Sequence, residues 1–248
     1  MDSIILSIVL PTFRESKTDY LRNIFLSLSD LKHCELIIVH KNSNDGTLEL
    51  ISEFRKRLNL RTVKIILSES ISRGKRLKEG FENSKGKLIL FHHPRSIVER
   101  TGLEYLIKNS DTLDWGGFTH KFDEDNLFFA FTSFYSNKIR ADRNKIFYLD
   151  HCIYAKRKLL EITDLPEVEI FEDTCLSILL REIVSPRRLN FLSTTSTIRF
   201  RKNGILFQII LNQFMKLGFY FRVPVSLLNR IYEKSLELNS PSEKKTKV

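Results

Sequence analysis

The sequence predicts an α/β protein with a largely parallel sheet, and three observations lead to this class. Short apolar runs rich in Ile, Leu and Val recur in the first hundred residues and predict strands buried on both faces. Stretches with apolar residues at helical spacing lie between these runs. Three of the runs end in polar clusters. Strands that alternate with helices pair in parallel, so these clusters should meet at one sheet edge, where α/β proteins bind ligands.

The elements of the first hundred residues follow a β-α-β-α-β-α-β order. The expected strands are Ile4–Leu10, Leu36–Val39, Val63–Leu67 and Lys87–Phe91. The expected helices are Tyr20–Leu31, a helix opened by Asp45-Gly46-Thr47, and Arg73–Ser84. The polar clusters are Pro11-Thr12-Phe13-Arg14-Glu15, the run from His40 to Gly46, and His92-His93-Pro94-Arg95-Ser96.

Beyond residue 100 the pattern is less regular. The expected elements are an extended segment Trp115–Phe122, a helix Asn126–Ile139, a short strand Tyr148–Tyr154, a helix Phe171–Arg181 capped by Asp173 or Thr174, and amphipathic helices Ile205–Leu217 and Ser226–Leu236. We therefore expect a main domain over residues 1–203, a helical appendage over 204–238 and a disordered tail over 239–248.

Composition and charge narrow the class of protein. The chain has 248 residues, 42% hydrophobic and 28% charged, as in soluble globular proteins. Its net charge of +10 favours an anionic partner: a nucleotide, a nucleic acid or an acidic lipid surface. Three scattered cysteines indicate a reducing compartment, and Asp2 stands where a signal peptide would be basic. Polar residues interrupt the longest apolar stretch, Ile205–Phe221, which argues against a membrane span and favours a cytoplasmic protein.

The motifs along the chain resemble those of a known family. Ser7-Ile8-Val9-Leu10-Pro11-Thr12-Phe13-Arg14-Glu15 is similar to S-I-V-I-P-T-Y-N-E, and Ile37-Ile38-Val39 with Ser43-Asn44-Asp45-Gly46-Thr47 to V-V-D-D-G-S-x-D-G-T. Ser72-Arg73-Gly74-Lys75-Arg76, Phe171-Glu172-Asp173-Thr174 and the run from Arg199 to Gly204 continue the resemblance. These patterns, in this order, resemble the inverting family-2 glycosyltransferases of the GT-A fold, a Rossmann-like fold, in their short bacterial subgroup.

The resemblance implies a UDP- or GDP-linked sugar donor lying across the sheet edge. It assigns donor contacts to Pro11, Thr12, Glu15, His40, Arg73, His92, Arg95, Arg199 and Arg201. Arg73 stands at a predicted helix start, where backbone N–H groups also favour an anion. From the residues alone, Glu15 and Arg73 could equally be ordinary charged residues of the surface.

Glu172 and Asp173 are the catalytic candidates. An inverting transfer needs a carboxylate to take the proton of the acceptor hydroxyl as its oxygen attacks the anomeric carbon. The resemblance gives that role to Asp173, with Glu172 beside it. The competing interpretation is that Asp173 is simply the N-cap of a helix.

The chain departs from the family pattern at two strand ends. Where the family has an aspartate for the nucleobase, this chain has His40-Lys41, and His92-His93-Pro94 replaces the D-x-D element that holds Mg²⁺ or Mn²⁺. Pro94 has no side-chain oxygen for a hard cation, so we expect no metal site. The cations that could replace the metal are Lys41, Arg95, Arg199, Arg201 and Lys202. A metal-independent enzyme and a lapsed site fit this pattern equally well.

Fewer residues are predicted to contact the acceptor than the donor. Trp115 is a candidate stacking platform, and Asp150-His151 match a place where the family has G-D-Q near the acceptor. The helix expected over Ile205–Leu217, with Lys216 and Arg222 near its end, could rest on an anionic membrane and meet a lipid-linked acceptor, as an alternative to packing on the main domain.

The sequence thus predicts a hexosyltransferase-class enzyme that moves a sugar from a nucleotide to a carbohydrate or lipid-linked acceptor with inversion. Two alternatives remain at this point. One is a lapsed relative that binds a nucleotide or a protein partner through the same cleft. The other is a basic nucleic-acid-binding protein, against which the dispersed cations and the lack of a binding motif argue. A sugar nucleotidyltransferase would need a Gly-rich loop after the first strand, which this chain does not have.

Overall fold

The computed structural model describes residues 3–57 and 62–234. Its strands are β1 (Leu6–Thr12), β2 (Cys34–Lys41), β3 (Thr62–Ser68), β4 (Leu88–Phe91), β5 (Ser96–Val98), β6 (Trp115–Phe122), β7 (Ile153–Lys156) and β8 (Arg187–Thr195). Its α-helices are α1 (Tyr20–Leu28), α2 (Thr47–Arg57), α3 (Arg73–Glu82), α4 (Arg100–Lys108), α5 (Leu127–Phe134), α6 (Arg157–Ile162), α7 (Glu172–Ile183), α8 (Ile198–Asn203), α9 (Ile205–Tyr220) and α10 (Val225–Lys234). A π-helix, η1 (Tyr135–Arg143), and a 3₁₀ turn, η2 (Leu149–His151), complete them. The tail predicted to be disordered lies outside the described residues.

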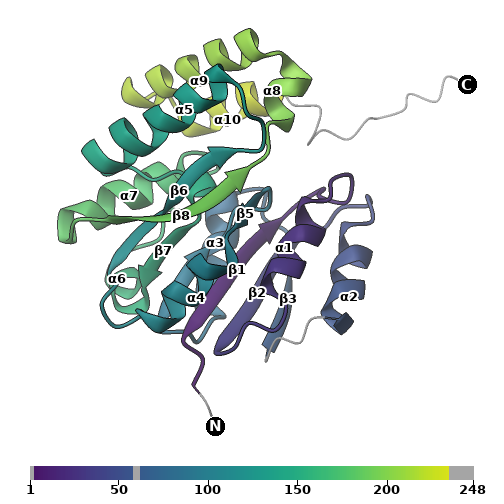
Figure 1. Ribbon diagram of the computed structural model, residues 1–248. Helices are drawn as coiled ribbons and strands as arrows, with labels where there is room; N and C mark the ends of the chain where they lie inside the picture. Colours follow the sequence, from purple (N-terminus) through teal and green to yellow (C-terminus); the bar gives the residue numbers. More distant parts are fainter. Residues whose placement is uncertain (1–2, 58–61, 235–248) are drawn as a thin grey trace, which may run out of the picture. The chain divides into compact units, whose positions relative to one another are not determined.

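The strands form one mixed sheet in the described part of the chain. Their order is β3-β2-β1-β4-β7-β6-β8-β5 (Figure 1). β1 pairs in parallel with β2 and β4, and β2 with β3, as the sequence predicts. β7 is antiparallel to both β4 and β6, while β8 runs parallel to β6. The predicted α/β class is therefore confirmed, with a parallel first half and a mixed second half.

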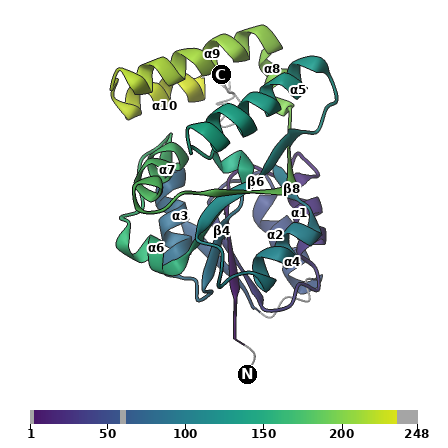
Figure 2. The same ribbon diagram turned by 60° about the vertical axis from the view of Figure 1, so that its left-hand side comes forward.

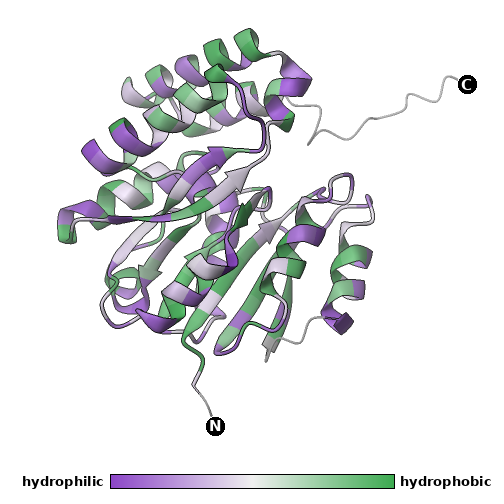
Figure 3. Cartoon of the chain, in the orientation of Figure 1, coloured by the Kyte–Doolittle hydropathy of each residue, from purple (hydrophilic) through white to green (hydrophobic). Residues whose placement is uncertain are grey.

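Helices cover both faces of this sheet and bury two apolar clusters. On one face, α1, α2 and α4 pack on alternate residues of β1 and β2, such as Ile8 and Ile38. On the other face, the side chains that alternate with them, such as Val9 and Val39, meet α3, α6 and α7 (Figure 2). β1, β2 and β4 are mostly apolar (Figure 3), because they are buried on both faces, whereas β8 mixes polar and apolar residues. Sheet and helices together hold the carboxyl ends of β1, β2 and β4 in fixed positions.

Several local predictions are wrong. Tyr148–Tyr154 is not one strand: η2 comes first, and β7 begins only at Ile153, after Cys152 with a positive φ of 49°. The helix predicted over Asn126–Ile139 becomes the π-helix η1 from Tyr135 onwards. Asp173 is not an N-cap, because the cap residue of α7 is Phe171, which has a left-handed φ of 67°.

The chain divides into two compact units. The first ends at Ser196 and contains the sheet, and the second begins at Thr197 and contains α8, α9 and α10. Within the second unit, α9 packs on α8 and α10, and Leu228 closes against Gly218 at a distance that leaves no room for a Cβ. Among the described residues, no helix combines the length and the apolar character that crossing a membrane requires.

Candidate active site

The ends of β1, β2 and β4 bring Thr12, His40 and His92 to the same sheet edge. Thr12 and His40 are register partners, and Thr12 Oγ1 lies 3.0 Å from His40 Nδ1. The backbone N–H of His92 donates to the carbonyl of Val9, which continues the β1–β4 pairing by one residue. All three side chains are fully buried, and Pro11 precedes them inside β1. The predicted convergence of the strand ends is therefore present.

Arg76 of α3 contacts the backbone at the end of β1. Its Nη1 donates to the carbonyl oxygen of Thr12 at 2.9 Å, and the residue is 7% exposed. Burial, with the charge of Arg73, lowers the pKa of Arg76 to about 10. Burial also lowers the pKa of His40, and that of His92 to about 4, so both imidazoles are neutral at pH 7.

Three buried nitrogens at this edge lack a hydrogen-bond partner among the described residues. They are His40 Nε2, Arg76 Nε and His92 Nε2. Buried polar atoms are rarely left unpaired in proteins, because each forgoes its hydrogen bonds to water. Their gathering at the strand ends indicates a site rather than ordinary core.

Glu15 and Arg95 form a buried ion pair across the edge. Arg95 Nε lies 2.8 Å from Glu15 Oε2, and Arg95 Nη2 lies 3.3 Å from Glu15 Oε1. Only 4% of the Glu15 side chain and 11% of the Arg95 side chain are exposed. The two predicted donor contacts therefore bind each other, which neutralises much of the positive charge that Arg95 would offer a diphosphate.

Asp45 organises the loop after β2. It accepts hydrogen bonds from the hydroxyls of Ser16 and Ser43 at 2.7 Å and from that of Thr47 at 2.9 Å. Burial raises the pKa of Asp45, but these bonds outweigh it and bring the pKa to about 2. Its carboxylate is thus committed to holding this loop against the loop after β1.

His93 and Asp150 form the most open polar pair of the edge. His93 Nε2 lies 3.8 Å from Asp150 Oδ1, and 39% of the Asp150 side chain is exposed. His93 Nδ1 accepts the backbone N–H of Arg95 at 3.2 Å, so a neutral His93 carries its proton on Nε2, facing Asp150. His93 was not among the predicted site residues. Its position in His92-His93-Pro94, which replaces the D-x-D element, could have indicated it.

Glu172 and Asp173 begin α7, opposite the first residue of α3. Arg73 Nε donates to Glu172 Oε1, and Arg73 Nη2 lies 3.9 Å from Asp173 Oδ2. Gly74 permits this approach, since a Cβ there would overlap the Pro166 carbonyl oxygen and lie 3.0 Å from the Glu172 Cβ. Ser72 caps α3 by accepting the N–H of Lys75. The structure therefore brings the predicted base and the predicted cation together.

Asp173 has both carboxylate oxygens held by backbone groups. Leu149 N–H donates to Oδ2 at 2.9 Å, and Thr174 N–H donates to Oδ1 at 2.6 Å. A carboxylate offers about four acceptor positions, so capacity remains for an incoming hydroxyl. Burial raises the pKa of Asp173 and of Glu172, while the Arg73 guanidinium opposes this rise in both. A raised pKa brings a carboxylate closer to the range in which a general base works best.

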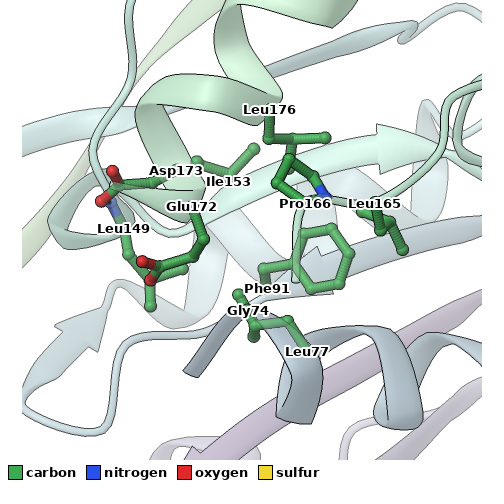
Figure 4. Close-up of a pocket in the computed structure, with 10 residues that line it drawn as sticks. All are labelled: Gly74, Leu77, Phe91, Leu149, Ile153, Leu165, Pro166, Glu172, Asp173 and Leu176. Carbon is green, nitrogen blue, oxygen red and sulfur yellow. Dashed lines mark hydrogen bonds between the residues drawn. The ribbon is translucent and has the colours of Figure 1, made fainter. Parts of the chain in front are cut away.

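A small cavity lies beneath the two carboxylates (Figure 4). Its volume is about 10 Å³, room for one water molecule, and its walls include Gly74, Leu77, Phe91 and Leu176. Glu172 Oε2 is buried and has no hydrogen-bond partner in the described part of the chain. The cavity is far too small for a nucleotide sugar.

Three of the seven non-glycine residues with positive φ in the described chain adjoin segments of the site. Arg14 (φ 55°) follows β1, Cys152 (φ 49°) follows the turn with Asp150, and Phe171 (φ 67°) precedes Glu172. Such conformations cost about 1–3 kcal/mol each and cluster where a backbone position serves function. They mark the same edge that the unpaired nitrogens mark.

Two predicted acceptor contacts lie in the interior instead. Trp115 is fully buried, its Nε1 donates to the carbonyl of Val184 at 2.7 Å, and its ring packs edge-on against Phe147. His151 is also fully buried, with Nδ1 2.9 Å from the Phe118 carbonyl oxygen. Neither ring is open to an acceptor, because apolar neighbours enclose both. Asp150 alone of the three predicted residues remains partly open.

Arg199 and Arg201 belong to α8 in the second unit. Arg199 Nη1 contacts the hydroxyl of Tyr232, and its guanidinium lies 4.8 Å from the centre of that ring. Their assignment as donor contacts stays a prediction. Arg76, which contacts the end of β1, was not among the predicted donor contacts.

The residues at the edge do not fit a Mg²⁺ or Mn²⁺ ion. Hard divalent cations take several oxygen ligands, usually carboxylates. Here Arg95 binds the Glu15 carboxylate, Arg73 binds that of Glu172, and hydroxyls surround Asp45. Pro94 offers no side-chain oxygen, and among residues 3–57 and 62–234 no group of three or more His, Cys, Asp or Glu could hold a metal.

The mixed sheet, parallel over β3-β2-β1-β4 and covered by helices on both faces, is a sheet of the GT-A type. The sequence profile described as "Glycosyl transferase family 2" matches residues 7–162, well over half of the chain. The protein belongs to glycosyl transferase family 2. Glu172 and Asp173 lie beyond the matched residues, so their assignment rests on geometry and on the motif.

Similar proteins agree on the fold. The chain is 29% identical over 109 residues to a Methanococcus voltae dolichyl N-acetyl-α-D-glucosaminyl phosphate 3-β-D-2,3-diacetamido-2,3-dideoxy-β-D-glucuronosyltransferase, a match of 43% of this chain and 33% of the relative. The structure of S. aureus TarS 1–349 with UDP-GlcNAc has a TM-score of 0.62 and 19% identity, with 78% of this chain and 58% of that one covered. The mannosyltransferase PcManGT from Pyrobaculum calidifontis with GDP-Man and Mn²⁺ has a TM-score of 0.56 and 12% identity, covering 94% and 74%. This chain thus spans a third of the curated relative and about three fifths of the TarS fragment.

Proposed function

We propose that the protein transfers a sugar from a nucleotide-sugar donor to an acceptor hydroxyl, with inversion at the anomeric carbon. Family membership supports the reaction class, and structural neighbours with UDP-GlcNAc and GDP-Man support the donor class. The observation that carries the proposal is the Arg73–Glu172–Asp173 group at the carboxyl edge of the parallel strands.

Asp173 acts as the general base in this proposal. Its carboxylate takes the proton of the acceptor hydroxyl while that oxygen forms the new bond to the anomeric carbon. The bond from the anomeric carbon to the diphosphate oxygen breaks, and its electron pair leaves with the nucleoside diphosphate. Arg73 keeps the carboxylate ionised against the effect of burial, and the backbone N–H groups of Leu149 and Thr174 fix its direction.

The leaving diphosphate is stabilised by protein groups in place of a divalent cation. Positioned cations and N–H donors stabilise developing negative charge most effectively where water is excluded. Arg76 and Lys41 border the strand ends, and Lys41 Nζ lies 4.7 Å from the centre of the Phe13 ring. Activity is therefore expected without added metal.

The acceptor is a carbohydrate or a lipid-linked sugar, bound on the side of Asp150. This residue is partly exposed, and its neighbour His93 presents a ring nitrogen toward it. A cytoplasmic location, at the inner face of a membrane, suits both acceptor classes.

The proposal is tested with a panel of UDP- and GDP-sugars. Thermal shift should show stabilisation by at least one nucleotide sugar, because a ligand that prefers the folded state raises its melting temperature. Release of the matching nucleoside diphosphate with a glycan acceptor should then persist in EDTA. Binding without turnover would instead identify a lapsed relative, and activity that EDTA abolishes and Mn²⁺ restores would overturn metal independence.

A further inference from the structure

The helix α9 buries one polar side chain and leaves many of its apolar side chains exposed. Its buried positions are Gln208, Leu211, Met215 and Gly218, and Gln208 is only 1% exposed. Gln208 exchanges hydrogen bonds with Asn203 at 2.8 Å and Asn212 at 2.7 Å, so the buried amide is satisfied within the second unit. A polar side chain thus occupies a buried position of a helix whose other residues are mostly apolar, and α9 is coloured largely as hydrophobic in Figure 3.

The outer face of α9 is a continuous apolar surface. It consists of Leu206, Phe207, Ile210, Phe214 and Leu217, each between 52% and 72% exposed. At 3.6 residues per turn these side chains fall within an arc of about 100°. Scattered exposed apolar residues are normal, but a contiguous patch on one helix marks an interaction surface. We call these five residues the α9 face.

Charge identifies the partner of the α9 face. From Thr197 to Lys234 the sequence has seven Lys or Arg residues and a single Glu, a surplus of six of the chain's net +10. Lys216 follows the middle of α9, and Arg222 follows its end and is exposed. An apolar helix face bordered by cations is the pattern of a helix that lies in the interface of an anionic bilayer.

A second copy of the chain fits this surface poorly. A symmetric dimer through the α9 face would bring two units with the same positive surplus together, and like charges oppose such a contact. The helix also lacks what spanning would require, as no described helix is long and apolar enough to cross a membrane. Lying on the surface is the geometry that remains.

We propose that α9 docks the protein on an anionic lipid surface. Leu206, Ile210 and Phe214 enter the boundary between headgroups and acyl chains, while Lys216 and Arg222 lie at headgroup level. The inference does not depend on glycosyl transfer, but it would place a lipid-linked acceptor beside the enzyme.

The test uses the full chain and sedimentation with vesicles of phosphatidylcholine, with and without phosphatidylglycerol. We expect binding to the anionic vesicles that weakens as salt is raised. Leu206→Ser, Ile210→Ser and Phe214→Ser combined should weaken it by about tenfold or more, because apolar burial is lost. Leu26→Ser, Leu67→Ser and Ile162→Ser form the matched control, since these side chains of the first unit are 62–70% exposed and should not affect binding.

The charge arm uses Lys216→Gln with Arg222→Gln. This pair should reduce the preference for anionic vesicles and leave nucleotide-sugar binding unchanged. Equal sedimentation with both vesicle types, or an α9-face variant that binds like the wild type, would overturn the proposal. So would a concentration-dependent dimer that the α9-face variant dissociates in the absence of lipid. Because vesicle binding needs no turnover, an inactive enzyme that still binds would refute only the proposed function.

Discussion

The two compact units differ in the polar groups that they bury and in the apolar surface of their helices. In the first unit, apolar side chains fill both faces of the sheet, and buried charges meet opposite charges, as in Glu15–Arg95 and Arg73–Glu172. In the second unit, the neutral Gln208 is buried beside the apolar Leu211 and Met215, while Phe214 on the same helix is half exposed. Burying charge is costly and is retained where it fixes specific groups, whereas exposing apolar surface calls for a partner. The first arrangement suits chemistry at a fixed site, and the second suits attachment.

The largest expected effect tests the chemistry of the first unit. Asp173→Asn keeps the shape of the side chain but removes its ability to take a proton. Transfer should fall by about 10²–10⁴-fold while donor binding persists. Asp164→Asn is the control, because Asp164 is an exposed carboxylate paired with Lys78. Turnover and nucleotide binding should be measured together; a fully active Asp173→Asn enzyme would remove Asp173 from the mechanism.

A second prediction concerns the charge that holds the acid pair ionised. Burial raises the pKa of Asp173, and Arg73 opposes this. A base works only above its pKa, so activity is lost as pH falls through the raised value, and Arg73→Met should move this acid limb to higher pH. At pH values below the pKa, kcat should drop about tenfold for each unit by which the pKa rises. The exposed neighbour gives a control, Lys75→Met; identical pH profiles for the two variants would contradict the role of Arg73.

Close packing of α3 on the segment before α7 gives a third prediction. Gly74→Ala would place a Cβ in steric overlap with the Pro166 carbonyl oxygen. Because this oxygen belongs to the backbone, it cannot move aside as the end of a flexible side chain would. The free energy of unfolding should fall by about 1–3 kcal/mol, and kcat should fall with it because Arg73 moves away from Glu172. Denaturant unfolding compares this variant with Lys75→Ala. Wild-type stability in Gly74→Ala would mean that the two segments separate without cost.

The smallest effect concerns His120, a buried histidine away from the carboxylates. Burial, with the nearby charge of Arg140, lowers the pKa of His120 to about 3, and neither of its ring nitrogens has a hydrogen-bond partner among the described residues. In the unfolded chain, His120 takes up a proton near pH 6.5, whereas in the folded protein it stays neutral down to about pH 3. The free energy of unfolding is therefore highest above pH 6.5 and decreases as the pH falls toward 3.

His120→Phe removes this titration and keeps an aromatic ring against Phe122. Between pH 6.5 and 5 the variant should lose about 2 kcal/mol less stability than the wild type, at about 1.4 kcal/mol per pH unit. Denaturant unfolding at the two pH values measures the difference. His33→Phe is the control, because His33 lies on a turn after α1. Parallel pH dependence in wild type and His120→Phe would show that His120 is already protonated or solvated.

The first half of the fold follows from the sequence, and the second half does not. Short apolar runs rich in β-branched residues and ended by polar clusters, such as Ile4–Leu10, favour strands covered on both sides, so β1 to β4 were predictable. β8 (Arg187–Thr195) was missed because it mixes arginines and hydroxyls with apolar residues. The short β5 and the nine-residue α4 were missed too. Such segments become ordered through their neighbours rather than through their own pattern.

The site was predictable where charge and motif coincide. Arg73 stands about a hundred residues before Glu172 and Asp173, and the motifs placed all three at the site, where the structure has them in contact. The pairing of Glu15 with Arg95 could not be foreseen, because it depends on side chains 80 residues apart meeting at one edge. Trp115 was predicted as a stacking platform but is fully buried. Its position could not be foreseen, since an aromatic residue that opens a strand packs in the core as readily as it lines a surface.

Phe171 carries a consequence for engineering. Its left-handed backbone would suit glycine better, and the side chain there costs the folded protein free energy immediately before the two carboxylates. A search for stabilising substitutions would therefore select Phe171→Gly early, and the same change would loosen the one peptide that aims Glu172 and Asp173. Substitutions meant to raise the stability of this enzyme should therefore avoid residue 171 and be made at positions remote from the sheet edge.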